Sequence, residues 1–176
     1  MSTSLHNHQL FRINVGFMLK ESAGYTRDIE FDVPVELYVE EIALHNLTGK
    51  LHLNRTPQGV LIQSRLRAER TVNCSRCLDS FDYPIEIEFS ELFVPVSQAD
   101  PESPFVIDDG DFVELTPIVR EESILAVPMQ ALCRDSCKGL CPECGQNFNE
   151  GHCNCERETI DPRLAQLRAL LDDQSS

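Results

Sequence analysis

The distribution of cysteine constrains this chain more than any other feature of its sequence. Six of the eight cysteines lie between Cys133 and Cys155, in the stretch CRDSCKGLCPECGQNFNEGHCNC, and the other two form a separate CSRC at Cys74 and Cys77. Thiolates two or three residues apart can bind one metal ion only where the backbone turns back, and Pro142 and Gly145 favour such a turn. A single CxxC is weak evidence, but eight cysteines at these spacings predict structural zinc.

Two other interpretations of the thiols fit the sequence less well. A disulfide framework needs an oxidising compartment, and two-residue CxxC loops make poor structural bridges. A thioredoxin-like redox site needs a strand followed by a helix N-terminus, and the sequence shows neither beside its cysteines. The N-terminal stretch MSTSLHNHQLFRINVGF lacks the basic and apolar blocks of a secretory signal, and no run of about 18 apolar residues is present. We therefore expect a cytoplasmic protein with reduced thiols.

Tetrahedral structural zinc takes four ligands, so eight cysteines divide into two sets. In the division that we favour, one ion is bound by a local set: Cys141, Cys144, Cys153 and Cys155. The other ion joins the distant CSRC to the start of the cysteine-rich stretch, through Cys74, Cys77, Cys133 and Cys137. The alternative places both CxxC pairs on one ion and the flanking four cysteines on the second. Full thiolate shells leave water no position, so we interpret His152, Glu143 and Glu150 as loop residues rather than a ligand or a catalytic base.

Apolar and polar residues alternate with a period of two over much of the chain, which predicts strands. The expected strands cover residues 11–19, 25–33, 37–44, 47–54, 60–73 and 81–96, of which 37–44 is ambiguous with a short helix. A switch of apolar parity after Ser90 predicts a bulge near Glu91. The CSRC lies between the last two strands, so we expect it at the tip of a long hairpin.

Two proline signals predict helices. Thr116 followed by Pro117 indicates an N-cap and a helix that ends at Ala126, and Asp161-Pro162 opens a second helix with a leucine stripe. The predicted fold is α+β: a mostly antiparallel β-sheet with two helices and a cysteine-rich zinc-binding C-terminal module. Residues 1–128 would form the β-rich core, and residues 129–176 the zinc module and terminal helix, packed on that core.

Charge is unevenly distributed along the chain. The formal net charge of −14 opposes general binding to nucleic acid. A local excess of basic residues nevertheless leads from Lys50 into the CSRC, and the stretch from Asp79 to Glu122 is strongly acidic. Either the basic residues are simply solvated, or they form a small surface that contacts RNA or a partner. The candidates for that surface are Arg65, Arg67, Arg76 and, brought close by the second zinc site, Lys138.

Several motifs resemble the bacterial YceD-like family, the large ribosomal RNA subunit accumulation proteins. The resemblance rests on CSRCL at 74–78, LTPIVREESILAVP at 115–128, CRDSCKGLCPECG at 133–145 with Asn147 and Asn149, and DPRL at 161–164. It covers roughly residues 10–171, nearly the whole chain, and is most specific in the cysteine-rich part.

This resemblance implies a cytoplasmic, non-enzymatic role in the synthesis, processing or stability of 23S ribosomal RNA, and hence in large-subunit biogenesis. The implied partner is 23S rRNA or its precursor, reached directly or through a basic large-subunit protein, with no membrane and no small-molecule substrate. Two other classes of function remain open on the residues alone: a zinc-dependent or thiol enzyme, and a metal-responsive binding protein.

Overall fold

The computed structural model describes residues 5–6 and 10–155. The strands of this part are β1 (Leu5–His6), β2 (Arg12–Asn14), β3 (Thr26–Val33), β4 (Leu37–Val39), β5 (Ile42–Arg55), β6 (Val60–Asn73), β7 (Ser80–Pro95), β8 (Val106–Ile107) and β9 (Phe112–Glu114). The helices are α1 (Gly16–Leu19) and α2 (Thr116–Leu125), with a short 3-10 helix, η1, at Val96–Gln98.

The strands form one sheet in the order β1-β4-β5-β6-β7-β8-β9-β2, and β3 pairs with β5 on the same side as β4. The long strands β5, β6 and β7 pair antiparallel, but β1 with β4 and β8 with β7 are parallel pairs. The sheet is therefore mixed, and the prediction of a mostly antiparallel sheet is wrong. A parallel pair depends on the path of the connecting chain, which strand periodicity does not reveal.

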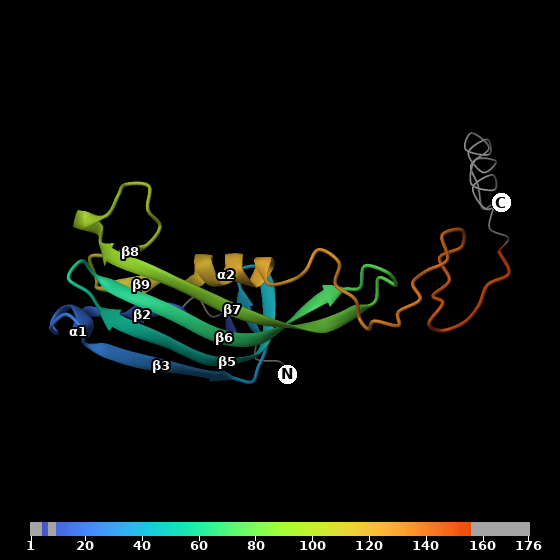
Figure 1. Cartoon of the computed structure of the whole chain (residues 1–176), viewed down its shortest axis with the longest axis horizontal. Helices are drawn as coiled ribbons and strands as arrows, with labels where there is room; N and C mark the ends of the chain where they lie inside the picture. The colour runs from blue at the N-terminus through green and yellow to red at the C-terminus, as the bar shows by residue number, and fades with distance from the viewer. Residues whose placement is uncertain (1–4, 7–9, 156–176) are drawn as a thin grey trace, which may run out of the picture.

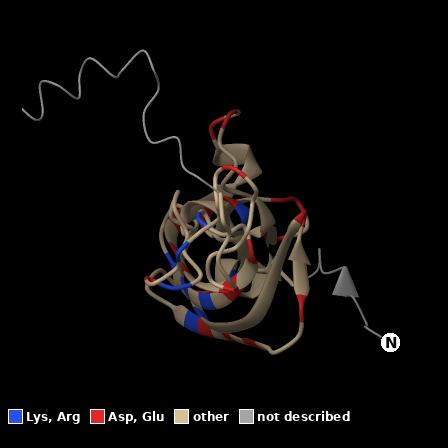
Figure 2. Ribbon diagram, turned by 90° about the vertical axis from the view of Figure 1, so that its right-hand side faces the viewer, with Lys and Arg blue, Asp and Glu red and all other residues tan. Residues whose placement is uncertain are grey.

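The apolar core lies on the inner side of a curled sheet, and Figure 2 shows the strands curving around a common centre. Strand β6 alternates as predicted, with these side chains fully buried: Val60, Ile62 and Leu66. Its two polar exceptions both have partners. The hydroxyl of Ser64 donates to the carbonyl of Ile87 at 2.9 Å, and Nη1 of Arg70 donates to the carbonyl of Ser123 in α2 at 3.0 Å.

The first predicted strand, residues 11–19, is only partly a strand. After β2, the carbonyl of Val15 accepts N–H groups from Met18 and Leu19, at 2.8 and 3.2 Å, and the chain forms the short helix α1. Phe11, Val15 and Met18 are buried, a spacing of four and then three residues that suits a helical turn. The alternation of Phe11 to Leu19 therefore concealed a change from strand to helix.

The predicted bulge near Glu91 is also wrong. The register of β6 with β7 is continuous from the pair Asn73↔Ser80 to the pair Val60↔Phe93, and Phe93 is buried like the earlier inward residues. Residues on the other face at this end of β7 are half-buried too, so both faces are apolar without a change of register. The register shift occurs instead between β5 and β6, near His45 to Thr48.

The other predicted elements agree more closely with the structure. Residues 37–44 form β4 and the start of β5, joined through Glu40 at φ 55°. Strand β3 ends before Pro34, as expected from the proline. Helix α2 carries Pro117 in its first turn, although the N-cap is Leu115 rather than Thr116. The predicted terminal helix after Asp161 lies outside the described residues.

The β6–β7 hairpin extends beyond the rest of the sheet, and the cysteine-rich segment runs from α2 along it to the far end of the molecule (Figure 1). The cysteines thus lie at one end and the main core at the other. Among the described residues, no helix is long and apolar enough to cross a membrane.

Candidate metal centre

The tip of the β6–β7 hairpin is a tight loop that aligns two thiols. Asn73 and Ser80 form the last strand pair, and within the loop the N–H of Cys74 donates to the carbonyl of Asp79 at 2.9 Å. The N–H of Leu78 donates back to the carbonyl of Cys74 at 2.9 Å, with Leu78 in the left-handed region at φ 63°. The predicted hairpin-tip position of CSRC is confirmed.

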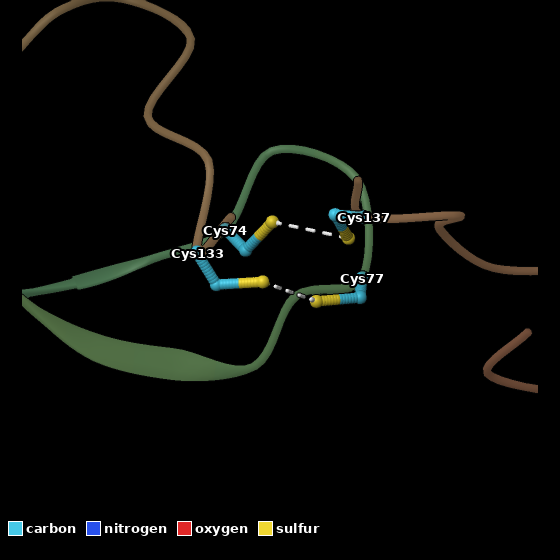
Figure 3. A group of neighbouring side chains, drawn as sticks. All are labelled: Cys74, Cys77, Cys133 and Cys137. Carbon is cyan, nitrogen blue, oxygen red and sulfur yellow. Dashed lines mark hydrogen bonds between the residues drawn. The ribbon is translucent and has the colours of Figure 1, made fainter. Parts of the chain in front are cut away.

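The segment after α2 completes a set of four thiols at this tip. The N–H of Ser75 donates to the carbonyl of Ala131 at 2.8 Å, which places the following cysteines beside the loop. Figure 3 shows the four sulfurs converging from the two segments: Cys74, Cys77, Cys133 and Cys137.

The spacing of these sulfurs fits a tetrahedral ion. The sulfurs of Cys74 and Cys137 are 3.8 Å apart, and those of Cys77 and Cys133 are 3.7 Å apart. A tetrahedron with metal–sulfur distances of about 2.3 Å, as zinc prefers, has sulfur–sulfur edges of about 3.8 Å. The eight cysteines are all free thiols, so the donor set consists of thiol sulfurs rather than bridges.

Three residues hold the loop of Cys137 in place. Nη1 of Arg76 donates to the carbonyl of Cys137 at 2.9 Å, and the carbonyl of Arg76 accepts the N–H of Leu140 at 3.1 Å. Gly139, at φ 75°, lets the two backbones meet, since a Cβ there would lie 3.0 Å from the carbonyl oxygen of Arg76. Nδ2 of Asn149 donates to the sulfur of Cys137 at 3.4 Å. The guanidinium of Arg76 is therefore engaged in supporting this site.

The second set of four thiols is built within residues 140–155. Leu140 and Asn147 form an isolated bridge, and inside it the N–H of Gly145 donates to the carbonyl of Cys141 at 2.9 Å. This loop repeats the contact that Leu78 makes at the hairpin tip. The sulfurs of the set lie within 4.8 Å of one another: Cys141, Cys144, Cys153 and Cys155.

The two sets reproduce the division that we favoured from the sequence, and the alternative that places both CxxC pairs together does not occur. They differ in exposure. In the hairpin set three sulfur-bearing residues are buried and Cys133 is half-buried, whereas Cys144 and Cys155 of the second set are exposed. His152 is exposed and belongs to neither set.

Hydrogen bonds lower the pKa of one thiol in each CxxC. The pKa of Cys74 falls to about 6, chiefly through the N–H of Cys133 and then those of Cys77 and Arg76. The pKa of Cys141 falls to about 6 through the N–H groups of Cys144 and Glu143. Because a metal binds the thiolate, a thiol that loses its proton easily is suited to be a ligand. Both residues are almost fully buried.

The basic candidates on the sheet have acidic partners. Nε of Arg65 lies 3.5 Å from Glu88, and Nε of Arg67 donates to Glu86 at 3.1 Å, with both arginine side chains more than two-thirds exposed. In Figure 2 basic and acidic segments alternate across neighbouring strands. Lys138 is exposed, and its backbone N–H donates to Oδ1 of Asn149 at 3.0 Å. Its position therefore depends on the same loop that Arg76 supports.

The supporting residues Asn149 and Gly139 were not singled out as functional from the sequence. Asn149 follows the second CxxC by five residues, and Gly139 lies between two cysteines, so each carries only a weak local signal. Gly139 is revealed by its close approach to Arg76, a residue of the distant hairpin tip, and Asn149 by the orientation of its side chain toward the sulfur of Cys137.

The fold and the site together define a β-sheet protein with two four-cysteine groups, each able to hold a metal ion, at the end of one hairpin. The YceD family, described as "Large ribosomal RNA subunit accumulation protein YceD", matches residues 62–171. The chain belongs to this family. It is 32% identical over 161 residues to the protein YlbN of Bacillus subtilis, an alignment that covers 85% of this chain and 92% of YlbN.

Two further relatives extend the comparison. The chain is 30% identical over 151 residues to the Mycobacterium tuberculosis protein Rv2926c, with 81% of this chain and 72% of the relative covered. It is 29% identical over 138 residues to "Large ribosomal RNA subunit accumulation protein YCED homolog 1, chloroplastic" of Arabidopsis thaliana. This alignment covers 60% of this chain and 42% of the relative. No solved structure matches the chain.

Proposed function

We propose that this protein is a non-enzymatic factor that promotes the accumulation of 23S ribosomal RNA during large-subunit biogenesis. Membership of the YceD family carries the proposal, because the family is described by that role. The proposal places the protein in the cytoplasm, where ribosomes assemble and thiols stay reduced.

The proposed cofactor is zinc, two structural ions bound by eight cysteines. All-sulfur tetrahedral sites suit zinc, and the sulfur–sulfur distances of the hairpin set agree with its bond lengths. Four thiolates around each ion leave no open position for water, which supports a structural rather than a catalytic role. On this proposal residues 129–155 form a module that zinc attaches to the hairpin.

The proposed contact with rRNA is made by Arg65 and Arg67, with Arg76 and Lys138 contributing at the tip. Arg65 also lines a shallow depression of about 490 Å³ on the outer face of the sheet, together with Lys50 and Gln63. Because Arg65 and Arg67 are exposed, their acidic partners hold them only weakly, and a phosphate group could compete for them. A basic large-subunit protein that contacts the acidic stretch 79–122 would be the indirect route to the same RNA.

The cellular test is the ratio of 23S to 16S rRNA in a bacterium depleted of the protein. We expect the ratio to fall on depletion and to recover with the wild-type chain, but not with Cys74→Ser, which removes one ligand of the hairpin site. An unchanged ratio on depletion would contradict the proposed role.

The RNA contact is tested with two reciprocal double variants in a binding assay with 23S rRNA fragments. Arg65→Glu with Arg67→Glu should weaken association about tenfold or more at low salt, because two phosphate contacts become repulsive. Glu86→Gln with Glu88→Gln should strengthen it, because both arginines lose their acidic partners. If neither pair changes binding, the protein reaches rRNA through another surface or through a partner protein.

A further inference from the structure

The long strand β3 has one open edge. It pairs with β5 through the register Thr26↔Asn54 to Val33↔Leu47, and no described strand pairs with its other side. Farther along the same side of β5, the edge of β4 is covered by the parallel strand β1. Among the described residues, the eight-residue edge of β3 is therefore left uncovered beside an edge that already accepts a strand.

The residues whose backbone groups face this open edge can be identified from the ladder. In an antiparallel pair, alternate residues direct both backbone groups toward the partner strand. The N–H of Arg55 donates to the carbonyl of Tyr25 at 2.8 Å, so odd-numbered residues of β3 bond to β5. On the other side of β5, the N–H of Thr56, which directly follows the strand, donates to the carbonyl of Gly59 at 2.9 Å. The even-numbered residues of β5 therefore bond to β6 and its odd-numbered residues to β3, which gives the same answer. The outward groups on β3 thus belong to its even-numbered residues: Thr26 at the start of the strand and the three acids Asp28, Glu30 and Asp32.

These three residues also give the edge a distinct charge. All three side chains are exposed and acidic, and they share the outer face of the sheet. Asp28 lies near His52 and Lys50 of β5, at 2.5 and 3.5 Å, whereas Glu30 and Asp32 have no ion pair among the described residues. On the inner face, Ile29 and Val33 are only half-buried.

We propose that the β3 edge binds an extended, basic segment of a partner polypeptide as an additional strand. Backbone hydrogen bonds would join it to Asp28, Glu30 and Asp32, in the manner of strand addition. Alternate lysine or arginine side chains would face the acidic row, and the apolar residues between them would complete the burial of Ile29 and Val33. The inference stands on the strand edge and does not depend on the proposed role in rRNA accumulation.

A second copy of this chain fits the same edge poorly. Pairing β3 with β3 of another molecule would place acidic side chains of the same outer-face row opposite one another. Like charges directly opposite each other in a sheet are destabilising. RNA fits no better, because the three acids whose backbone groups face outward carry the same sign as phosphate.

The test is an NMR titration of the full-length protein, in its zinc-loaded form, with a short synthetic peptide of alternating lysine and valine. Binding at the edge should slow hydrogen exchange at the amides of Asp28, Glu30 and Asp32, while the amides already bonded to β5 change little. A peptide with glutamate in place of lysine should not bind. Slowed exchange at none of the three amides would overturn the proposal.

Charge reversal at the edge separates specific binding from general attraction to an acidic protein. Glu30→Lys with Asp32→Lys should weaken peptide binding about tenfold, because two attractive cross-strand pairs become repulsive. The matched control, Glu102→Lys with Asp109→Lys, makes the same change of net charge at exposed loop residues and should keep most of the affinity. Equal losses in both would overturn the proposal, and so would a dimer of the wild-type chain that the edge variant abolishes.

The backbone contribution is isolated by comparing Glu30→Pro with Glu30→Gln. Both remove the charge, but only proline also removes the outward N–H, and an edge strand tolerates it there. We expect the proline variant to bind several-fold more weakly than the glutamine variant. If the proline variant fails to fold, the charge-reversal pair still decides the question.

Discussion

At the scale of single residues, Asn149 supports the hairpin set of thiols. Its Nδ2 donates to the sulfur of Cys137 and its Oδ1 accepts the N–H of Lys138. Residues that support a metal ligand typically contribute 10- to 100-fold to metal affinity. We predict that Asn149→Ala weakens zinc binding at this site about tenfold, measured by competition with a chromophoric chelator.

The control for this substitution is Asn154→Ala, an exposed asparagine between Cys153 and Cys155. It should leave the affinity of the hairpin site unchanged. Equal affinity in the wild type and Asn149→Ala would show that the hydrogen bond to Cys137 has no role in holding the metal.

Residue types alone give an incomplete signal for the two cysteine loops. Gly145 follows its CxxC in the left-handed region at φ 74°, and Leu78 occupies the same position after the other CxxC at φ 63°. Leucine is disfavoured there because its Cβ approaches the backbone. The hydrogen-bonded loop around the ligands therefore fixes this conformation even where the sequence lacks glycine.

At the scale of elements, the close contact of β5 with β6 depends on Gly49. Its φ is 129°, and a Cβ there would lie 2.3 Å from the carbonyl oxygen of Arg65. Gly24 also has a positive φ, 93°, but a Cβ there would meet nothing within 4 Å. We predict that Gly49→Ala lowers the free energy of unfolding by roughly 3 kcal/mol or more, and Gly24→Ala by about 1 kcal/mol.

Chemical denaturation of the two variants measures this difference. Both substitutions impose a similar backbone penalty, so the excess for Gly49→Ala reports the contact with β6. Similar losses for both would mean that the strands separate at this point without cost.

The turn before β9 should make stability depend on pH. The carboxylate of Asp108 accepts N–H groups from Phe112 at 2.8 Å and Gly110 at 2.9 Å, and a guanidinium N–H from Arg12 at 3.0 Å. These bonds, chiefly that of Phe112, hold the pKa of Asp108 below its ordinary value of 3.8. A lowered pKa in the folded state stabilises the protein above the unfolded value, and the stabilisation is lost as pH falls through the folded value.

We therefore predict that Asp108→Asn lowers the midpoint of thermal unfolding at neutral pH and that the difference from the wild type shrinks as the pH falls below the ordinary value of 3.8, through the lower pKa of the folded state. Thermal unfolding over a pH series measures it, with Asp109→Asn, an exposed neighbour, as the control. A difference that persists in acid would mean that the carboxylate charge does not support this turn.

Much of the sheet could be predicted because one face of each long strand is buried. The alternation of β6 places its residues correctly, and the position of CSRC between β6 and β7 gives the hairpin tip. The segment from Gly16 to Leu19 was wrongly predicted as a strand because its conformation depends on tertiary packing. The carbonyl of Val15 accepts the first hydrogen bonds of a helix there, and the side chain of Met18 is buried in the core. A period of two in the sequence does not reveal either contact. Counting ligands in fours predicted two sets of thiols but left two divisions open, and only the folded chain shows which sulfurs meet and which contacts support them.

At the scale of the whole molecule, the apolar residues form two separate clusters. The larger one fills the curled sheet and includes no cysteine. The smaller one surrounds the hairpin site, where Phe81, Leu132 and Leu140 pack against the thiols. Because the smaller cluster is built around the ligands, it should depend on the metal, whereas the larger one should not.

We predict that a zinc chelator loosens residues 131–155 and the hairpin tip while the main sheet stays folded. Hydrogen exchange should rise at amides such as those of Leu140 and Cys141, whose bonds join the metal-binding loops, and remain slow at Leu51 and Ile62 in the core. Cooperative loss of the whole sheet would show instead that the metal sites support the fold throughout.

Native mass spectrometry of two variants extends this test to each ion. Cys74→Ser should lose the hairpin ion and Cys153→Ser the other, each retaining one zinc, because each substitution removes a ligand from only one set. The link between the sets runs from the carbonyl of Arg76 to the N–H of Leu140 and from Nδ2 of Asn147 to Asp79 at 3.0 Å. This link consists of hydrogen bonds and shares no thiol between the sets, so Cys74→Ser should leave the second site occupied. Loss of both ions from either variant would mean that the two sites form only together.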